Sequence, residues 1–161
     1  MSDISWVETA FRLALAAVLS GFIGYEREYR HKPAGMRTNM LVGMGTAAMT
    51  MVSIAVARFS PSPEAVDVSR IASTILTGIG FIGAGTIIRS RGHVLGLTTA
   101  ASIWVVAAIG LATGMGLYPI AIFTTVMALA VLAILRNIHI PEECEKQEQV
   151  FVLPREEEKK L

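Results

Sequence analysis

Three stretches of this chain contain no charged residue at all, namely residues 38–57, 71–88 and 97–135. About 20 apolar residues in a helix, each adding about 1.5 Å, cross the roughly 30 Å hydrocarbon core of a bilayer. Only 17% of the 161 residues are charged, whereas soluble domains contain about 25%. The sequence therefore predicts an integral membrane protein in which helices occupy most of the chain.

The loop signals divide the apolar part of the chain into five predicted transmembrane helices. Their expected ranges are residues 6–25, 37–57, 71–88, 98–114 and 119–135. Pro33 and Gly35 mark a sharp loop after the first helix, and Gly114 and Gly116 suit a helix end just before Pro119. We expect an all-α bundle in a membrane domain of residues 1–136, followed by a short acidic cytoplasmic tail of residues 137–161.

Lysine and arginine gather at alternate ends of these helices, which predicts their orientation. On one side of the membrane we expect Arg27, Arg30, Lys32, Arg37, Arg89, Arg91 and Arg136. Because such residues favour the cytoplasmic side, the N-terminus should lie outside and the C-terminus inside. Arg12 is the one charge of the first helix expected inside the membrane, and Glu8, four residues earlier, can pair with it near the outer surface.

Several classes of function are disfavoured. A net charge of +1 leaves no basic face for nucleic acid, and the single Cys144 excludes a multi-cysteine metal site. No Ser/His/Asp or Cys/His arrangement suggests covalent catalysis. Residues 78–83 have the spacing G-x-G-x-x-G, but a dinucleotide site needs this motif between a strand and a polar helix start, not inside an apolar run. We expect no enzyme, no nucleic-acid partner and no cofactor.

A row of glycines follows in the third predicted helix, at Gly78, Gly80, Gly83 and Gly85. Small residues let membrane helices approach closely, so packing is one interpretation of this row. A broken helix that serves function is the other, because glycine-rich membrane helices can break where their backbone is buried. The glycine surface also predicts a homo-oligomer, most simply a dimer.

Glu26, Arg37 and Arg89 each lie at the cytoplasmic end of a different predicted helix. Antiparallel neighbours would bring the three to the same depth, where charge-assisted hydrogen bonds could join them. Glu28 points about 200° away from the face of Glu26. The alternative is a solvated collar of charges, with Glu26 in an ordinary i,i+4 pair with Arg30.

Thr98 and Thr99 open the fourth predicted helix, where a threonine hydroxyl can cap free N–H groups. The same helix start could instead attract an anion.

No Asp, Glu or His lies within predicted helices two to five, although ion carriers usually place such groups there. Mg²⁺ typically uses one or two carboxylates. The weak metal candidates are therefore Glu26 and Asp67, both at the membrane edges.

Four sequence blocks, in this order, resemble the MgtC/SapB family of bacterial inner-membrane proteins. They are residues 24–28 (GYERE), 33–38 (PAGMRT), 67–70 (DVSR) leading into 78–85 (GIGFIGAG), and 96–101 (GLTTAA) with Trp104 and Gly110. The resemblance covers residues 13–135. The candidate functional or packing residues are Glu26, Arg27, Glu28, Arg37, Asn39, Arg70, Gly78, Gly80, Gly83, Gly85, Arg89, Thr98, Thr99 and Trp104.

The resemblance implies a multi-pass domain of four to five helices in the bacterial inner membrane. It also implies a regulatory role in adaptation to low Mg²⁺, associated in some relatives with virulence and with restraint of the membrane sector of ATP synthase. Transport of Mg²⁺ or another ion is the alternative function. Longer members carry a cytoplasmic domain similar to the ACT fold after the last helix, and this chain ends about 25 residues beyond Leu135.

Overall fold

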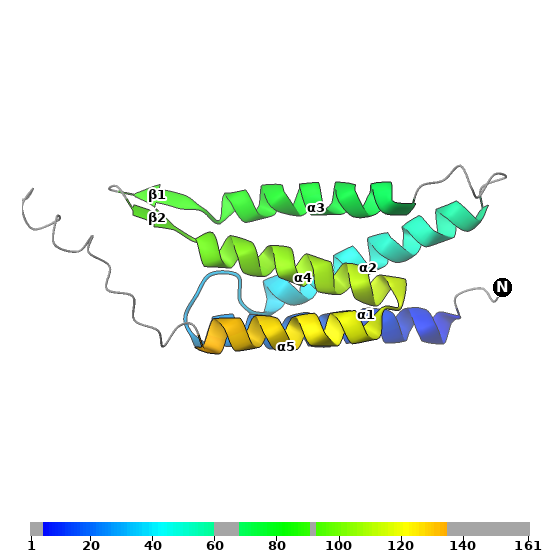
Figure 1. The fold of residues 1–161 in the computed structure, drawn as a ribbon, viewed down its shortest axis with the longest axis horizontal. Helices are drawn as coiled ribbons and strands as arrows, with labels where there is room; N and C mark the ends of the chain where they lie inside the picture. Colours follow the sequence, from blue (N-terminus) through cyan, green and yellow to red (C-terminus); the bar gives the residue numbers. More distant parts are fainter. Residues whose placement is uncertain (1–4, 60–67, 91–92, 135–161) are drawn as a thin grey trace, which may run out of the picture.

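The computed structural model describes residues 5–59, 68–90 and 93–134, and it contains five α-helices (Figure 1). They are α1 (Trp6–Tyr29), α2 (Met36–Phe59), α3 (Val68–Gly85), α4 (Leu97–Met115) and α5 (Tyr118–Ile134). Each coincides with one predicted helix, but α1 continues beyond residue 25 and α3 ends before residue 88. The α1 extension places Glu26, Arg27 and Glu28 on a regular helix.

The fold is helical as predicted, and a short hairpin between α3 and α4 is the one addition among the described residues. Strands β1 (Ile88–Ser90) and β2 (His93–Leu95) pair antiparallel, with Ile88 opposite Leu95 and Arg89 opposite Val94. The β-branched side chains of Ile88 and Val94 suit extended backbone. The sequence had predicted Ile88 as the last residue of the third membrane helix because its side chain is apolar. The hairpin lies at the same end of the bundle as the α1–α2 connection (Figure 1).

Helix α4 forms the centre of the bundle, because it contacts all four other helices. One apolar cluster joins α1, α4 and α5 through Ile23, Ile109 and Ala121, and a second joins α3 and α4 through Ile79 and Ile103. α3 packs on α4 and α2 and covers one side of the bundle, opposite α5 (Figure 1).

Glycines on α2 and α4 bring these two helices into backbone contact. A Cβ at Gly110 would overlap Thr46 Oγ1 and the carbonyl oxygen of Gly43, and one at Gly114 would lie 2.7 Å from the carbonyl oxygen of Ala47. Gly43 is equally close to Ser20 of α1. The tight core is therefore α1–α2–α4, as expected where small residues let helices approach.

The glycine row of α3 does not take part in this close packing. Among the described residues, a Cβ on Gly78, Gly80 or Gly85 would have no neighbour within 4 Å. A Cβ on Gly83 would make only an ordinary contact with Ala100 at 3.6 Å. α3 runs as one helix through the row, so the broken-helix interpretation is wrong. The interpretation that Gly78, Gly80 and Gly85 pack closely within the chain is also wrong. The predicted packing of these glycines between two copies of the chain stays a prediction.

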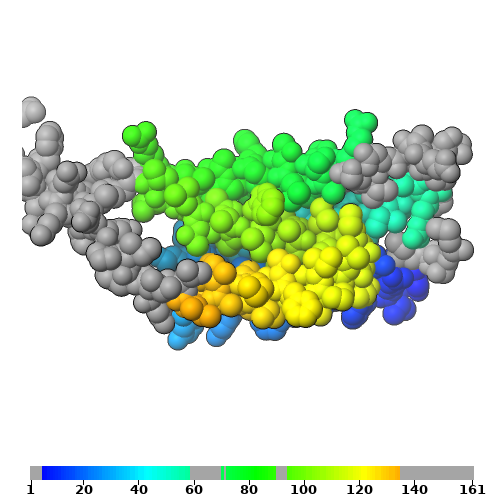
Figure 2. All heavy atoms as spheres, viewed as in Figure 1, coloured from blue at the N-terminus to red at the C-terminus, as the bar shows by residue number. Residues whose placement is uncertain are grey.

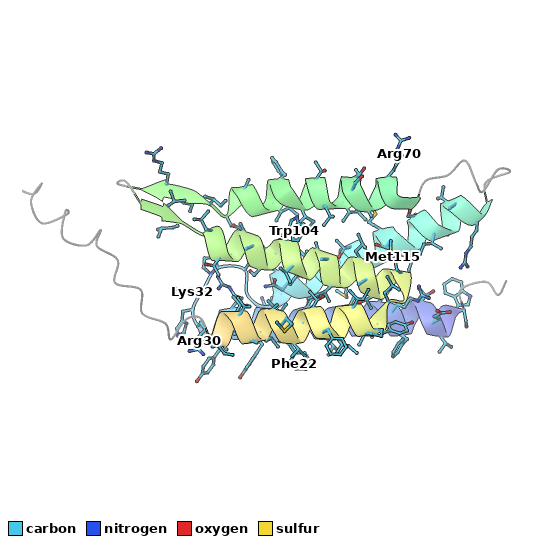
Figure 3. The ribbon with its side chains drawn as sticks, viewed as in Figure 1. Phe22, Arg30, Lys32, Arg70, Trp104 and Met115 are labelled. Carbon is cyan, nitrogen blue, oxygen red and sulfur yellow. The ribbon has the colours of Figure 1, made fainter. Side chains whose placement is uncertain are left out.

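The described helices suit a membrane. α1, residues 36–58 of α2 and α4 are long and apolar enough to cross a bilayer, and α5 and residues 72–85 of α3 are shorter apolar helices. Large apolar side chains cover the outside of the bundle, among them Phe22, which projects from α1 (Figure 3), and Phe123 on α5. Such a surface is stable in lipid rather than in water.

Candidate functional site

A buried arginine joins α1 to α4 near the α1–α2 connection. Arg27 is only 5% exposed, and its Nη2 donates a hydrogen bond of 2.6 Å to Thr99 Oγ1 in the first turn of α4. Its Nε is buried and has no hydrogen-bond partner among the described residues. A charged group in such a position is costly and in membrane proteins usually marks function. Glu26, Glu28 and Asn39 lie at the same α1–α2 connection, and together with Arg27 and Thr99 they are called the Arg27 cluster.

Asn39 holds the connection between α1 and α2 in place. It is completely buried, and its Nδ2 donates to the carbonyl oxygens of Ala34 at 2.5 Å and Gly35 at 2.9 Å. Ala34 needs this support, because its φ of 56° is unfavourable for a residue with a side chain. Gly24 allows the close approach, since a Cβ there would lie 3.1 Å from Asn39 Cβ and 2.6 Å from Met36 Cα.

Glu28 caps the start of α2. Its Oε2 accepts a hydrogen bond of 2.9 Å from the backbone N–H of Met36, the first residue of that helix. The first N–H groups of a helix have no partner within it. Glu28 therefore has a definite structural contact, which the sequence analysis missed because the two residues lie on different helices.

The predicted network of Glu26 with Arg37 and Arg89 is wrong. Within the described ranges, Glu26 Oε1 pairs instead with Arg30 Nε at 3.4 Å, the i,i+4 alternative, and no ion pair joins it to Arg37 or Arg89. Both of these arginines are exposed. Arg89 lies on the hairpin rather than on a membrane helix, so the premise of three helix ends at one depth fails. Glu26 Oε2 is buried and has no hydrogen-bond partner in the part of the chain that the structure describes.

The predicted threonine cap of α4 is also wrong. Gly96 occupies the N-cap position with a φ of 92°, and no side chain caps the helix start. A Cβ on residue 96 would overlap the carbonyl oxygen of Thr86, which explains the glycine. Thr99 instead faces Arg27, and Thr98 is exposed on the neighbouring surface.

The remaining candidates lie apart from the Arg27 cluster. Trp104 lies halfway along α4 and is half exposed, and Arg70 projects outward at the opposite end of the bundle (Figure 3). Asp67 lies outside the described residues. Within the residues that the structure describes, no three His, Cys, Asp or Glu side chains come close enough to hold a metal ion.

At the α4–α5 end, Arg12 pairs with Glu8, as predicted. Its Nη1 also donates a hydrogen bond of 2.5 Å to the carbonyl oxygen of Gly114, near the end of α4. The positive charge thus lies at the negative end of a helix dipole. The predicted glycine end of α4 is confirmed at Gly116, whose φ is 81°.

A line of small polar side chains on α2 was missed by the sequence analysis. Asn39, Thr46, Thr50 and Ser53 are buried at the interfaces of α2. Thr46 and Thr50 donate to carbonyl oxygens of their own helix, at 2.7 Å each, which satisfies the hydroxyls without a partner helix. Their spacing of seven, four and three residues was the available signal, because it places all four on one helix face.

Removing the Glu28 cap gives a testable effect. We expect Glu28→Ala to lower the free energy of unfolding by about 1 kcal/mol, because a lost N-terminal cap typically costs about that much. Glu28→Gln keeps an acceptor oxygen and should cost less. Thermal unfolding in mild detergent measures both variants, and equal losses would contradict the capping role.

The chain is similar to known proteins of one family. A model of the MgtC family matches residues 13–140. The "Putative magnesium transporter YhiD" of Escherichia coli (strain K12) is 46% identical over 133 residues, which are 81% of this chain and 62% of that protein. "Protein MgtC" of Brucella abortus (strain 2308) is 46% identical over 130 residues, 81% of this chain and 52% of that protein.

A further relative, "Protein SrpB" of Synechococcus elongatus, is 38% identical over 136 residues, which are 80% of this chain and 75% of that protein. The chain thus spans between about half and two thirds of the length of the YhiD and MgtC relatives. No solved structure matches.

Proposed function

Because this chain belongs to the MgtC family, we propose that it is a multi-pass protein of the bacterial inner membrane that acts in adaptation to low Mg²⁺ by binding other membrane proteins. All five helices cross the bilayer in this proposal, with the N-terminus outside and the C-terminus inside. The relation to Mg²⁺ rests on the name of the YhiD relative and on the family resemblance.

The observation that carries an interaction role is an open groove between α2 and α3. It has a volume of about 780 Å³ and an apolar lining, with Gly45 on one wall and Gly78 on the other. Both glycines have nothing within 4 Å of a built Cβ. A helix of another protein can therefore approach the backbone on both walls.

The core of the bundle also favours binding over transport. Backbone contacts at Gly43 and Gly110 close the space between α1, α2 and α4, and the Thr46 and Thr50 hydroxyls turn to their own helix. The carboxylates of the described residues lie on α1, at Glu8, Glu26 and Glu28. An ion crossing the bundle would need polar groups along its path.

The two partners that we propose are a second copy of the chain, forming a homodimer, and the membrane sector of ATP synthase. The open glycines Gly78, Gly80 and Gly85 of α3 are the surface at which copies would pair. Light scattering in mild detergent measures the dimer, and a monomeric native chain would contradict it.

The topology is tested by labelling introduced cysteines in a Cys144→Ser background. We expect Leu117→Cys, in the turn after Met115, to react with an impermeant reagent added outside intact cells. Lys32→Cys, in the α1–α2 connection, should react only after the membrane is opened. The two positions lie at opposite ends of the bundle, where Figure 3 labels Met115 and Lys32. The reverse pattern would overturn the orientation.

Two measurements separate binding from transport. Proteoliposomes of the purified chain should take up Mg²⁺ no faster than empty liposomes, and protein-dependent uptake would establish the transporter alternative. In cells at low Mg²⁺, Gly78→Leu should impair growth and reduce co-purification of ATP synthase subunits. Ala84→Leu is the control, because Ala84 is exposed on α3, does not line the groove and is not one of the glycines proposed for the dimer. Equal behaviour of the two variants would contradict partner binding at this groove.

A further inference from the structure

The start of α4 is suited to an anion. No side chain of the described residues caps it. The N–H groups of its first turn have no partner within the helix, and they carry the positive end of the helix dipole. Arg27 lies against this turn through its hydrogen bond to Thr99. A guanidinium has five N–H donors, and the buried Nε of Arg27 has no partner among the described residues.

An apolar groove begins beside this position. It has a volume of about 480 Å³ and lies between α4, α5 and one residue of α1. Its lining on α4 runs from Thr98, next to Thr99, to Val105, a distance of about 10 Å along the helix axis. Ile23 of α1 also lines it and lies one turn before Arg27, on the same helix face.

The start of α4 with Arg27, and the apolar groove beside it, match the two parts of a phospholipid. Such a lipid carries a phosphate at the membrane surface and an apolar chain below it. We propose that Arg27 and the first turn of α4 bind the phosphate of one anionic phospholipid, whose acyl chain lies in the groove between α4 and α5. Arg30 and Lys32 add positive charge at this end, which favours an anionic over a zwitterionic headgroup. This site is separate from the α2–α3 groove of the proposed function.

The experiment titrates the purified full-length chain, in neutral detergent, with phosphatidylglycerol or phosphatidylcholine. Native mass spectrometry counts the bound lipid, and thermal unfolding measures the stabilisation. We expect one phosphatidylglycerol to be retained and to raise the Tm more than phosphatidylcholine does. Arg27→Gln should weaken binding by about tenfold or more, since a hydrogen bond to a charged group contributes at least that factor.

Two further variants keep the test decisive. Ala101 is exposed and lines the groove, so Ala101→Leu should fill the space for the acyl chain and weaken binding without touching Arg27. Arg37→Gln removes the same charge from an exposed position at the same end and should leave binding nearly unchanged. If Arg27→Gln does not fold, Ala101→Leu decides the matter.

Three results would overturn the proposal. Binding by Ala101→Leu at the native level would exclude the acyl-chain groove. An equal loss in Arg37→Gln and Arg27→Gln would indicate attraction to surface charge rather than a site. Equal stabilisation by inorganic phosphate alone would indicate a site for a free anion.

Discussion

Gly110→Ala is expected to reduce the stability of the bundle by about 3 kcal/mol or more, at the upper end of the penalties for overpacking. The added methyl group would overlap Thr46 Oγ1 and the carbonyl oxygen of Gly43 on α2. The Gly43 oxygen belongs to the backbone and cannot rotate away, so α2 and α4 must separate. That separation also weakens the contact of α2 with α1, because Gly43 packs on Ser20. Denaturant unfolding in detergent micelles measures the loss.

Gly45→Ala is the matched control for this effect. Gly45 lies on α2, two residues from Gly43, but nothing is within 4 Å of a Cβ at this position. Alanine favours a helix over glycine by about 0.8–1 kcal/mol, so the variant should be as stable as the native chain or more stable. Similar losses in Gly110→Ala and Gly45→Ala would show that helix contact does not set the cost.

Thr99→Val is expected to cost about 3 kcal/mol in the absence of added anionic lipid. Valine has nearly the shape of threonine but cannot accept the hydrogen bond of Arg27 Nη2. A buried charged group would then lose its hydrogen-bond acceptor, and leaving a buried polar group unsatisfied costs about 1–3 kcal/mol, more when the group is charged. Thermal unfolding of the purified chain measures the change.

Arg27→Met should cost less than Thr99→Val, although it removes the charge itself. Methionine fills a similar length with apolar atoms. The Thr99 O–H, which the bond from Arg27 does not use, can still donate to a carbonyl oxygen of its own chain, as Thr46 and Thr50 do. The double variant should recover most of the loss caused by Thr99→Val. If Thr99→Val is harmless while Arg27→Met is severe, the charge of Arg27 stabilises the bundle through another contact.

The amino-acid sequence determined the helices of this protein well. Five apolar segments became five helices, because uncharged runs of this length can bury their backbone polar groups only as helices in lipid. Contacts between residues close together in the chain were also predictable, because the helix geometry alone sets which of them are neighbours. Glu8 and Arg12 lie four residues apart on one helix and pair as expected, and Gly116 ends α4.

The tertiary structure alone decided which of these residues meet. Arg27 and Thr99 are 72 residues apart in the chain. For Glu26 the sequence favoured Arg37 and Arg89 as partners, because it could not show that β1 removes Arg89 from the helix ends. The glycines were misjudged for a related reason. Packing was one interpretation of the row on α3, yet Gly43 and Gly110 form the close contact. A small residue permits a close approach only where the bundle places another helix against it.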